Sequence, residues 1–217
     1  MSAMRKRRET PFSISPNPSN LYLTSGLKAA IHKVNYVIDN ARGLTAILGD
    51  VGMGKSSVLR LIYSDYLSRD DTTVRLIPAP NFTTDFAMIK AITGNFGLPP
   101  KKSRYDQEQE FCKYLLGEYE RERIVLLLID EAQSLSTRML ELIRTLLNFE
   151  SNTDKLIQIV LAGQIELKDR LLEPSKKALR SRIFAPSLLD PLTLGETRSM
   201  LEFRCERAEI HLPLDDE

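Results

Sequence analysis

The sequence predicts an α/β fold in which helices alternate with the strands of a parallel sheet. Three features of the 217-residue chain indicate this class. Short apolar runs alternate with segments whose apolar residues recur every three or four positions, which is the pattern of repeated βαβ units. Residues 124–129 are apolar throughout, as expected for a central strand that is covered on both faces. A glycine-rich loop at residues 49–54 lies directly between an apolar run and a helical segment.

The first half of the chain follows this alternation. Residues 1–20 are polar and proline-rich and are expected to form an extended lead-in. Residues 24–41 fit a helix, because apolar side chains recur along one face and Thr24 or Ser25 can cap its start. The elements expected next are a strand at 44–48, a helix at 54–67, a strand at 73–78, a helix at 86–96, a loop at 99–104 and a helix at 107–121.

The second half repeats the pattern after the central strand at 124–129. A helix is expected at 137–148, because Leu140, Ile143 and Leu147 share one face. The remaining expected elements are a strand at 156–161, a last strand at 183–188 that contains Pro186, and a helix at 196–207.

The composition is that of an ordinary globular chain. Hydrophobic residues make up 42% and charged residues 27%, which suits one core domain with a small appendage. The net charge of +1 indicates neither a strongly basic nor an acidic surface overall. Cys112 and Cys205 lie outside any C-x-x-C or Cys/His cluster, so neither a disulfide framework nor a structural metal is expected. The isolated His32 and His211 are interpreted as surface or helix-face residues.

A phosphate-binding motif lies between the first strand and the second helix. It satisfies G-x-x-x-x-G-K-[ST] in the strand–loop–helix context that supports this pattern and disfavours a chance glycine-rich turn. Glycines let successive backbone N–H groups face a phosphate, and the helix N-terminus favours the anion. Lys55 is expected to neutralise β- and γ-phosphate charge, and the Ser56 hydroxyl to bind Mg²⁺. The residues expected to bind ATP are Gly49, Asp50, Val51, Gly52, Met53, Gly54, Lys55, Ser56 and Ser57.

Two carboxylates follow the apolar strand at 124–129. Asp130 and Glu131 are expected at the carboxyl edge of the sheet, where open α/β sheets bind ligands. We expect Asp130 to approach the Mg²⁺ shell and Glu131 to polarise the water that attacks the γ-phosphate. The alternative is a pair of surface acids after a core strand.

Two weaker signals concern the same reaction. Gln164 follows the strand at 156–161, where its side chain can orient the attacking water or serve only as a turn residue. Arg182 precedes the last apolar run and can supply positive charge to the γ-phosphate of a neighbouring subunit, with Arg180 as the alternative. The other interpretation of these arginines is a solvated basic pair.

Two basic segments are candidate nucleic-acid contacts. Lys101, Lys102 and Arg104, together with the basic segment at residues 5–8, are candidate contacts to the backbone of duplex DNA, unless both segments are simply solvated. No aromatic stacking platform accompanies them. No run reaches the ~18 apolar residues of a membrane span, and no secretory signal is evident. We therefore expect a cytoplasmic protein without direct membrane insertion.

With these residues in place, the chain resembles the AAA+ ATPases of the ExeA/TniB/TnsC (Mu B-like) group over residues 10 to 208. The Gly-Lys-Ser and Asp-Glu-Ala-Gln motifs are shared by many ATPases, whereas Leu-Ala-Gly-Gln-x-Glu-Leu is more typical of this group. The matching pieces are Pro11-Phe12-Ser13, Leu21-Tyr22-Leu23, Gly43-Leu44, Gly97-Leu98-Pro99, Asp130-Glu131-Ala132-Gln133, Leu161-Ala162-Gly163-Gln164, Glu166-Leu167, Arg182-Ile183, Leu192-Thr193-Leu194 and Glu196-Thr197.

The resemblance implies an AAA+ core with a five-stranded parallel sheet in the order 5-1-4-3-2 and ATP at the subunit interfaces of a ring or helical homo-oligomer. It gives Gln164 the sensor 1 position, Arg182 the arginine-finger position, and residues 21–27 the wall beside the adenine. The implied organisation is an extended segment at 1–20, the AAA+ core at 21–190 and a partial lid at 191–217. About one lid helix remains before Glu217, and no Gly-x-Pro-Arg segment follows, so a minimal or truncated lid is expected.

Three functions fit these features. The first is a DNA-associated AAA+ ATPase that regulates a transposase-like partner. The second is a cytoplasmic assembly or motor ATPase for a secretion or pilus system. The third is an ATP-dependent scaffold with little turnover, against which the presence of Glu131 and Arg182 counts.

Overall fold

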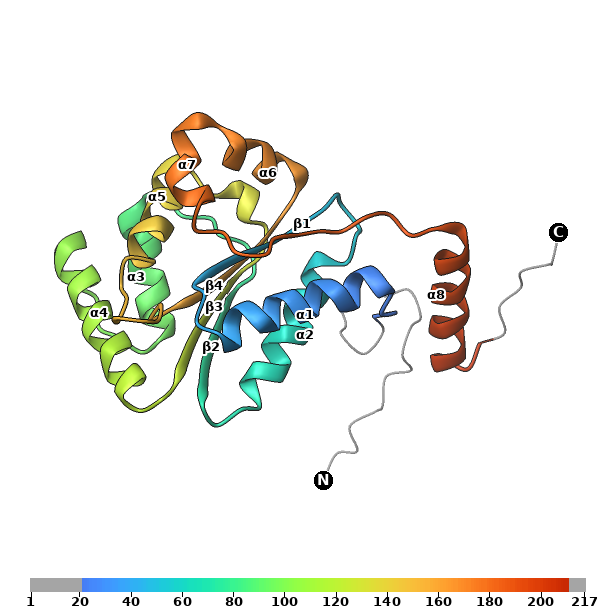
Figure 1. The fold of residues 1–217 in the computed structure, drawn as a ribbon, viewed down its shortest axis with the longest axis horizontal. Coiled ribbons are helices and arrows are strands. Elements are labelled where there is room, and N and C mark those ends of the chain that lie inside the picture. The colour runs from blue at the N-terminus through green and yellow to red at the C-terminus, as the bar shows by residue number, and fades with distance from the viewer. Residues whose placement is uncertain (1–20, 211–217) are drawn as a thin grey trace, which may run out of the picture.

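The computed structural model describes residues 21–210 (Figure 1). The expected lead-in at 1–20, with its basic segment at residues 5–8, lies outside the described residues. So do residues 211–217, which include His211 and the end of the expected partial lid.

Within the described residues, five parallel strands form one sheet in the order β2-β3-β4-β1-β5. This is the expected order 5-1-4-3-2 taken from the other edge, so the predicted fold class is confirmed. The strands are β1 (Leu44–Leu48), β2 (Thr72–Ile77), β3 (Ile124–Ile129), β4 (Gln158–Gly163) and β5 (Ser187–Leu188).

Helices cover both faces of this sheet. One layer consists of α1 and α2, and the other contains α3 to α7 (Figure 1). The helices are α1 (Ser25–Asp39), α2 (Lys55–Leu67), α3 (Asp85–Asn95), α4 (Arg104–Glu120), α5 (Thr137–Leu146), α6 (Ile165–Leu172), α7 (Lys177–Arg180) and α8 (Leu194–Arg207). Two 3-10 turns, η2 (Ala132–Ser134) and η3 (Pro174–Lys176), complete them.

The central strand β3 is apolar throughout because both of its faces are packed against helices. Val125 and Leu127 pack into the core beneath α3 to α7, whereas Leu126 and Leu128 pack into the core beneath α1 and α2. All four side chains are buried, so neither face leaves room for a polar residue. The chain that follows β3 therefore leaves the sheet from a rigid and fully packed strand.

The last strand is shorter than predicted. Ile183 makes only an isolated bridge to Leu44, and the ladder resumes at Ser187. Between them, Ala185 has a positive φ of 46° and Pro186 has no N–H to give to a ladder. The predicted strand at 183–188 was therefore wrong in extent, and β5 is a two-residue edge strand.

The observed bounds of other elements also differ from the expected ones. Helix α4 begins at Arg104 rather than 107, because the Ser103 hydroxyl accepts the backbone N–H of Asp106 at 3.1 Å and caps the helix. Strand β4 begins two residues later than predicted, at Gln158. Helices α6 and α7 were not anticipated at all.

Helix α8 stands apart from the two layers, at the end of an extended segment that leaves β5 (Figure 1). Its start is fixed by a capping box between Thr193 and Glu196. Tyr22, which precedes α1, lies against Phe203 of α8 with ring centroids 5.8 Å apart. Across residues 21–210, no helix combines the length and the apolar character needed to cross a membrane.

Candidate functional site

The loop between β1 and α2 leaves the first turn of α2 open to an anion. Gly52 and Gly54 have positive φ values of 82° and 83°, and a Cβ at either would point into open space or ordinary contact. The residue that precedes α2 is Gly54, so no side chain caps the free N–H groups of this turn, and no acidic residue lies in it. In contrast, side chains cap the N-termini of α1, α3, α4, α5 and α8. Uncapped donors at a helix N-terminus fit a phosphate.

Lys55 is held inside this loop. Only 6% of the residue is exposed, and its ammonium donates to the carbonyl oxygens of Gly49 at 3.0 Å and Asp50 at 2.7 Å. The loop thus wraps around a buried positive charge. This charge and the open N–H groups of α2 make one site for an anionic group.

Asp130 and Ser56 bring two oxygen ligands together beside the loop. Burial raises the pKa of Asp130, and hydrogen bonds from the Ser56 hydroxyl and the Glu131 backbone N–H oppose that rise. The N–H of Glu131 lies 2.9 Å from Asp130 Oδ1. A carboxylate and a hydroxyl are the oxygen donors that Mg²⁺ prefers, so these two side chains fit the expected ion.

Glu131 lies next to Asp130 but in a different environment. Its φ of 51° is in the left-handed region, which turns the chain sharply out of β3 into η2. Its Oε2 accepts from the side-chain amide of Gln133 and, at 3.5 Å, from that of Gln164. Gln164 therefore lies beside Glu131, as the sequence predicted.

Gln133 was not predicted as part of the site. It donates to Glu131 and accepts the backbone N–H of Gln164 at 3.1 Å. The only sequence signal was its place two residues after Glu131 in Asp-Glu-Ala-Gln.

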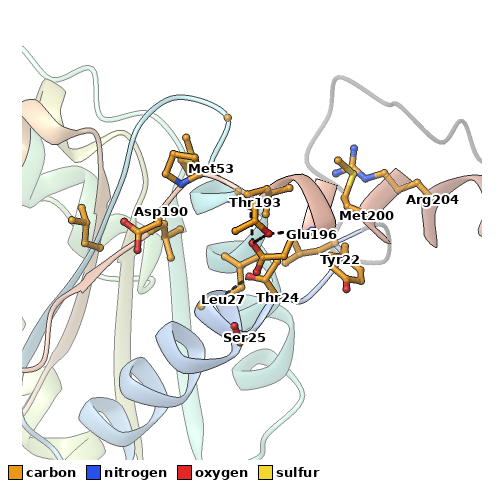
Figure 2. Close-up of a pocket in the computed structure, with 18 residues that line it drawn as sticks. Tyr22, Thr24, Ser25, Leu27, Met53, Asp190, Thr193, Glu196, Met200 and Arg204 are labelled. Atoms are coloured by element: carbon orange, nitrogen blue, oxygen red, sulfur yellow. Dashed lines mark hydrogen bonds between the residues drawn. The ribbon is translucent and has the colours of Figure 1, made fainter. Parts of the chain in front are cut away.

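A cavity of about 450 Å³ opens beside the loop, a size typical of small-molecule sites. Its walls come from four segments: residues 21–27, the loop at 52–54, residues 188–193 at and after the end of β5, and α8. Figure 2 shows Thr24, Ser25 and Leu27 from the start of α1 on one side, with Glu196 and Thr193 facing them. The predicted adenine wall at 21–27 does line this cavity.

Helix α8 brings Met200 and Arg204 to the same cavity (Figure 2). The Nε of Arg204 is buried and has no hydrogen-bond partner among the described residues. The sequence pattern did not single out Arg204, because its place at the cavity depends on how α8 folds back toward Tyr22.

The two candidate trans arginines bind backbone carbonyls within the chain. Arg182 donates to the carbonyl of Arg144 at 2.6 Å, in the last turn of α5, and is half-buried. Arg180 is exposed and donates to the carbonyl of Leu172 at 3.1 Å. Both lie on the segment around α7 that leads to β5.

The predicted basic loop is mostly neutralised. Lys101 pairs with Glu110 at 3.2 Å, and Arg104 pairs with Asp85 and with Glu108. Arg104 also belongs to the first turn of α4 rather than to the loop. Among Lys101, Lys102 and Arg104, only Lys102 is exposed.

Comparisons with known proteins agree with this geometry. A family model described as "AAA domain" matches residues 38–171. General secretion pathway protein A of Aeromonas hydrophila is 32% identical over 211 residues, which are 95% of this chain and 38% of that protein. The chain thus spans well under half the length of this curated relative.

Solved structures share the fold at low sequence identity. The Walker-type ATPase PABY2304 of Pyrococcus abyssi matches with a TM-score of 0.65 and 17% identity, over 94% of this chain and 64% of that chain. Cdc6p of Pyrobaculum aerophilum matches with a TM-score of 0.63 and 20% identity, over 85% of this chain and 51% of that chain.

Proposed function

The chain belongs to the AAA domain family, and from this premise we propose that it binds ATP with Mg²⁺ and hydrolyses it to ADP and phosphate. One observation carries the proposal. Glu131 lies beside the Asp130–Ser56 pair, at the mouth of a loop that buries Lys55 and leaves the first turn of α2 open. A phosphate-binding loop next to paired carboxylates is what hydrolysis of a nucleoside triphosphate requires.

Each site residue has a role in this reaction. The loop N–H groups and Lys55 bind the phosphates, and Ser56 and Asp130 hold Mg²⁺, which when bound neutralises charge on the phosphate oxygens. Glu131 accepts a proton from water as the water oxygen bonds to the γ-phosphorus. The bond from that phosphorus to the β,γ-bridging oxygen breaks, and ADP leaves with the bonding electrons. Gln164 orients the water.

The cavity beside the loop is the proposed nucleoside site. Apolar side chains such as Leu21, Leu27 and Met53 line it, which suits the faces of a base. Arg204 supplies an unpartnered donor from α8, so we assign this helix to a lid that contacts the nucleotide. The core then comprises residues 21–190, with α8 as the described part of the lid.

We further propose that the sites lie between subunits of a homo-oligomer and that Arg182 acts in trans. Arg182→Ala should bind ATP normally but hydrolyse it about tenfold or more slowly, because the γ-phosphate of the neighbour loses a positive charge. Turnover per wild-type subunit should rise with protein concentration in steady-state assays, and this rise should be absent in the variant.

Two further variants separate this role from a structural one. Arg182 also binds the end of α5, so Arg182→Lys keeps a cation there while removing the planar donor group. Arg180→Ala removes a neighbouring exposed arginine and should leave the concentration dependence intact. If wild-type turnover per subunit does not change with concentration, or if Arg180→Ala loses the rise instead, Arg182 is not the trans residue.

The biological process is a separate proposal. The 32% identity to a protein named for the general secretion pathway favours an assembly or motor ATPase of secretion, the second of the three functions above. The pairing of Lys101 and Arg104 with acids weakens the DNA-directed and transposase-linked alternative, whose remaining described contact is Lys102.

ATPase rate and sedimentation, with and without duplex DNA at low and moderate salt, decide between these functions. For the secretion-type function, DNA should change neither rate nor size. Assembly driven jointly by ATP and DNA, with binding that weakens steeply as salt rises, would establish the DNA-directed function instead. Tight ATP binding with negligible turnover under all conditions would favour the third function, an ATP-dependent scaffold.

A further inference from the structure

Gln133 joins two residues of the site through the two ends of one amide. Its Oε1 accepts the backbone N–H of Gln164 at 3.1 Å, and its Nε2 donates to Glu131 Oε2. A backbone N–H can only donate, so this contact fixes which end of the amide is the oxygen. The nitrogen must then face the Glu131 carboxylate.

The segment that carries Gln133 is itself held in place. Arg170 of α6 donates to the carbonyl of Gln133 at 2.8 Å and to that of Leu135 at 2.6 Å. A Cβ added at Gly163 would lie 3.3 Å from Gln133 Oε1 and 2.6 Å from Leu167, so the end of β4 packs closely against this amide. Gln133 therefore has little freedom to swing away from Glu131.

The other support of Glu131 is weaker. Gln164 Nε2 lies 3.5 Å from the same carboxylate oxygen, at the limit of a hydrogen bond. The contact from Gln133 is the shorter of the two, and it is backed by Arg170. Both known donors use Oε2, which leaves the other oxygen of Glu131 to accept a proton.

We propose that Gln133 is a positioning residue for hydrolysis. Its amide holds the Glu131 carboxylate in one orientation, and couples it to the backbone at the end of β4, where Gln164 lies. The inference rests on the proposed function, because it gives Gln133 a role only if Glu131 activates the water.

The test uses two substitutions of nearly equal size. Gln133→Met removes the donor and the acceptor but keeps the volume. Gln133→Glu keeps an oxygen for the Gln164 N–H and places a second negative charge beside Glu131, which like-charge repulsion disfavours. We expect kcat to fall about tenfold in Gln133→Met and further in Gln133→Glu, with KM for ATP within about twofold of wild type, since hydrogen bonds to charged groups are strong and ATP itself is not contacted.

The kcat of Gln133→Met is the decisive readout, because methionine keeps the volume of the side chain and removes its hydrogen bonds to Glu131 and Gln164. A residue that only fills space would keep the wild-type kcat in Gln133→Met, whatever the added charge does in Gln133→Glu, and that result would overturn the proposal. Gln109, an exposed glutamine of α4, provides matched controls, and Gln109→Met and Gln109→Glu should hydrolyse ATP at the wild-type rate.

Failure of the proposed function is distinguishable from failure of this inference. If the wild-type chain does not hydrolyse ATP, or if Glu131→Gln hydrolyses it normally, the proposed function is wrong. If wild type hydrolyses ATP and Glu131→Gln does not, only the Gln133 variants decide the inference.

Discussion

Lys55→Ala should raise the Kd for ATP by about 100-fold or more, which in practice abolishes binding at micromolar nucleotide. The reason is the position of the charge. The Lys55 ammonium is buried inside the loop and donates to two carbonyl oxygens of that loop, so no solvent-exposed cation can replace it. Titration with a fluorescent ATP analogue measures the change directly.

The same substitution has a second consequence for the loop. Without the ammonium, the carbonyl oxygens of Gly49 and Asp50 lose a donor, which costs roughly 1–3 kcal/mol of folding stability for each oxygen that stays buried. Thermal unfolding therefore has to accompany the titration, to show that the variant is folded. Lys28→Ala is the matched control, because Lys28 is an exposed lysine of α1. Binding by Lys55→Ala within twofold of the control would remove Lys55 from its role.

Elements whose pattern is set by burial on both faces could be predicted from sequence. Strands β1 and β3 were located at their observed bounds because all their residues except the partly buried Ile124 are buried. Helices with a polar cap before an apolar stripe, such as α1 after Thr24, were also located closely. The prediction worked where the local pattern and the packing agree.

Elements that depend on tertiary contacts could not be predicted. Helices α6 and α7 are eight and four residues long and lack a side-chain cap in the structure, so they rely on the burial of Leu167, Leu171 and Leu179 against the sheet. Strand β5 is cut short by the conformation of Ala185, which no periodicity encodes.

In the site, too, the contiguous motifs could be predicted, whereas the residues placed by tertiary contacts could not. The loop around Lys55 and the pair Asp130–Glu131 are contiguous motifs whose chemistry follows from residue type and context. Gln133 lies two residues after Glu131 in the same motif, but its contact with Gln164 and its support by Arg170 depend on how β4 and α6 pack against η2, which sequence spacing alone does not reveal. The ion pairs of Lys101 and Arg104 could not be predicted either, because the acids come from α3 and from further along α4.

Glu131→Gln should retain ATP but lose hydrolysis by roughly 10²- to 10⁴-fold, the usual contribution of a general base. The substitution keeps the shape of the side chain, and an amide oxygen can still accept from Gln133 and Gln164. Phosphate binding is unaffected because Lys55 and the first turn of α2 are unchanged. Single-turnover phosphate release, measured alongside the Kd for ATP, separates the two effects.

The backbone at this position demands a specific control. Glu131 has a positive φ of 51°, and so a loss of activity could reflect a changed turn rather than a lost carboxylate. Glu122 is an exposed glutamate with a φ of 57° in the turn after α4, so Glu122→Gln makes the same substitution in the same backbone conformation away from the site. If Glu122→Gln keeps full turnover and Glu131→Gln binds ATP without cleaving it, the carboxylate itself is responsible. Normal turnover in Glu131→Gln would instead require another group to activate the water, and Asp130, the acid next to Glu131 in the chain, would be the next residue to replace.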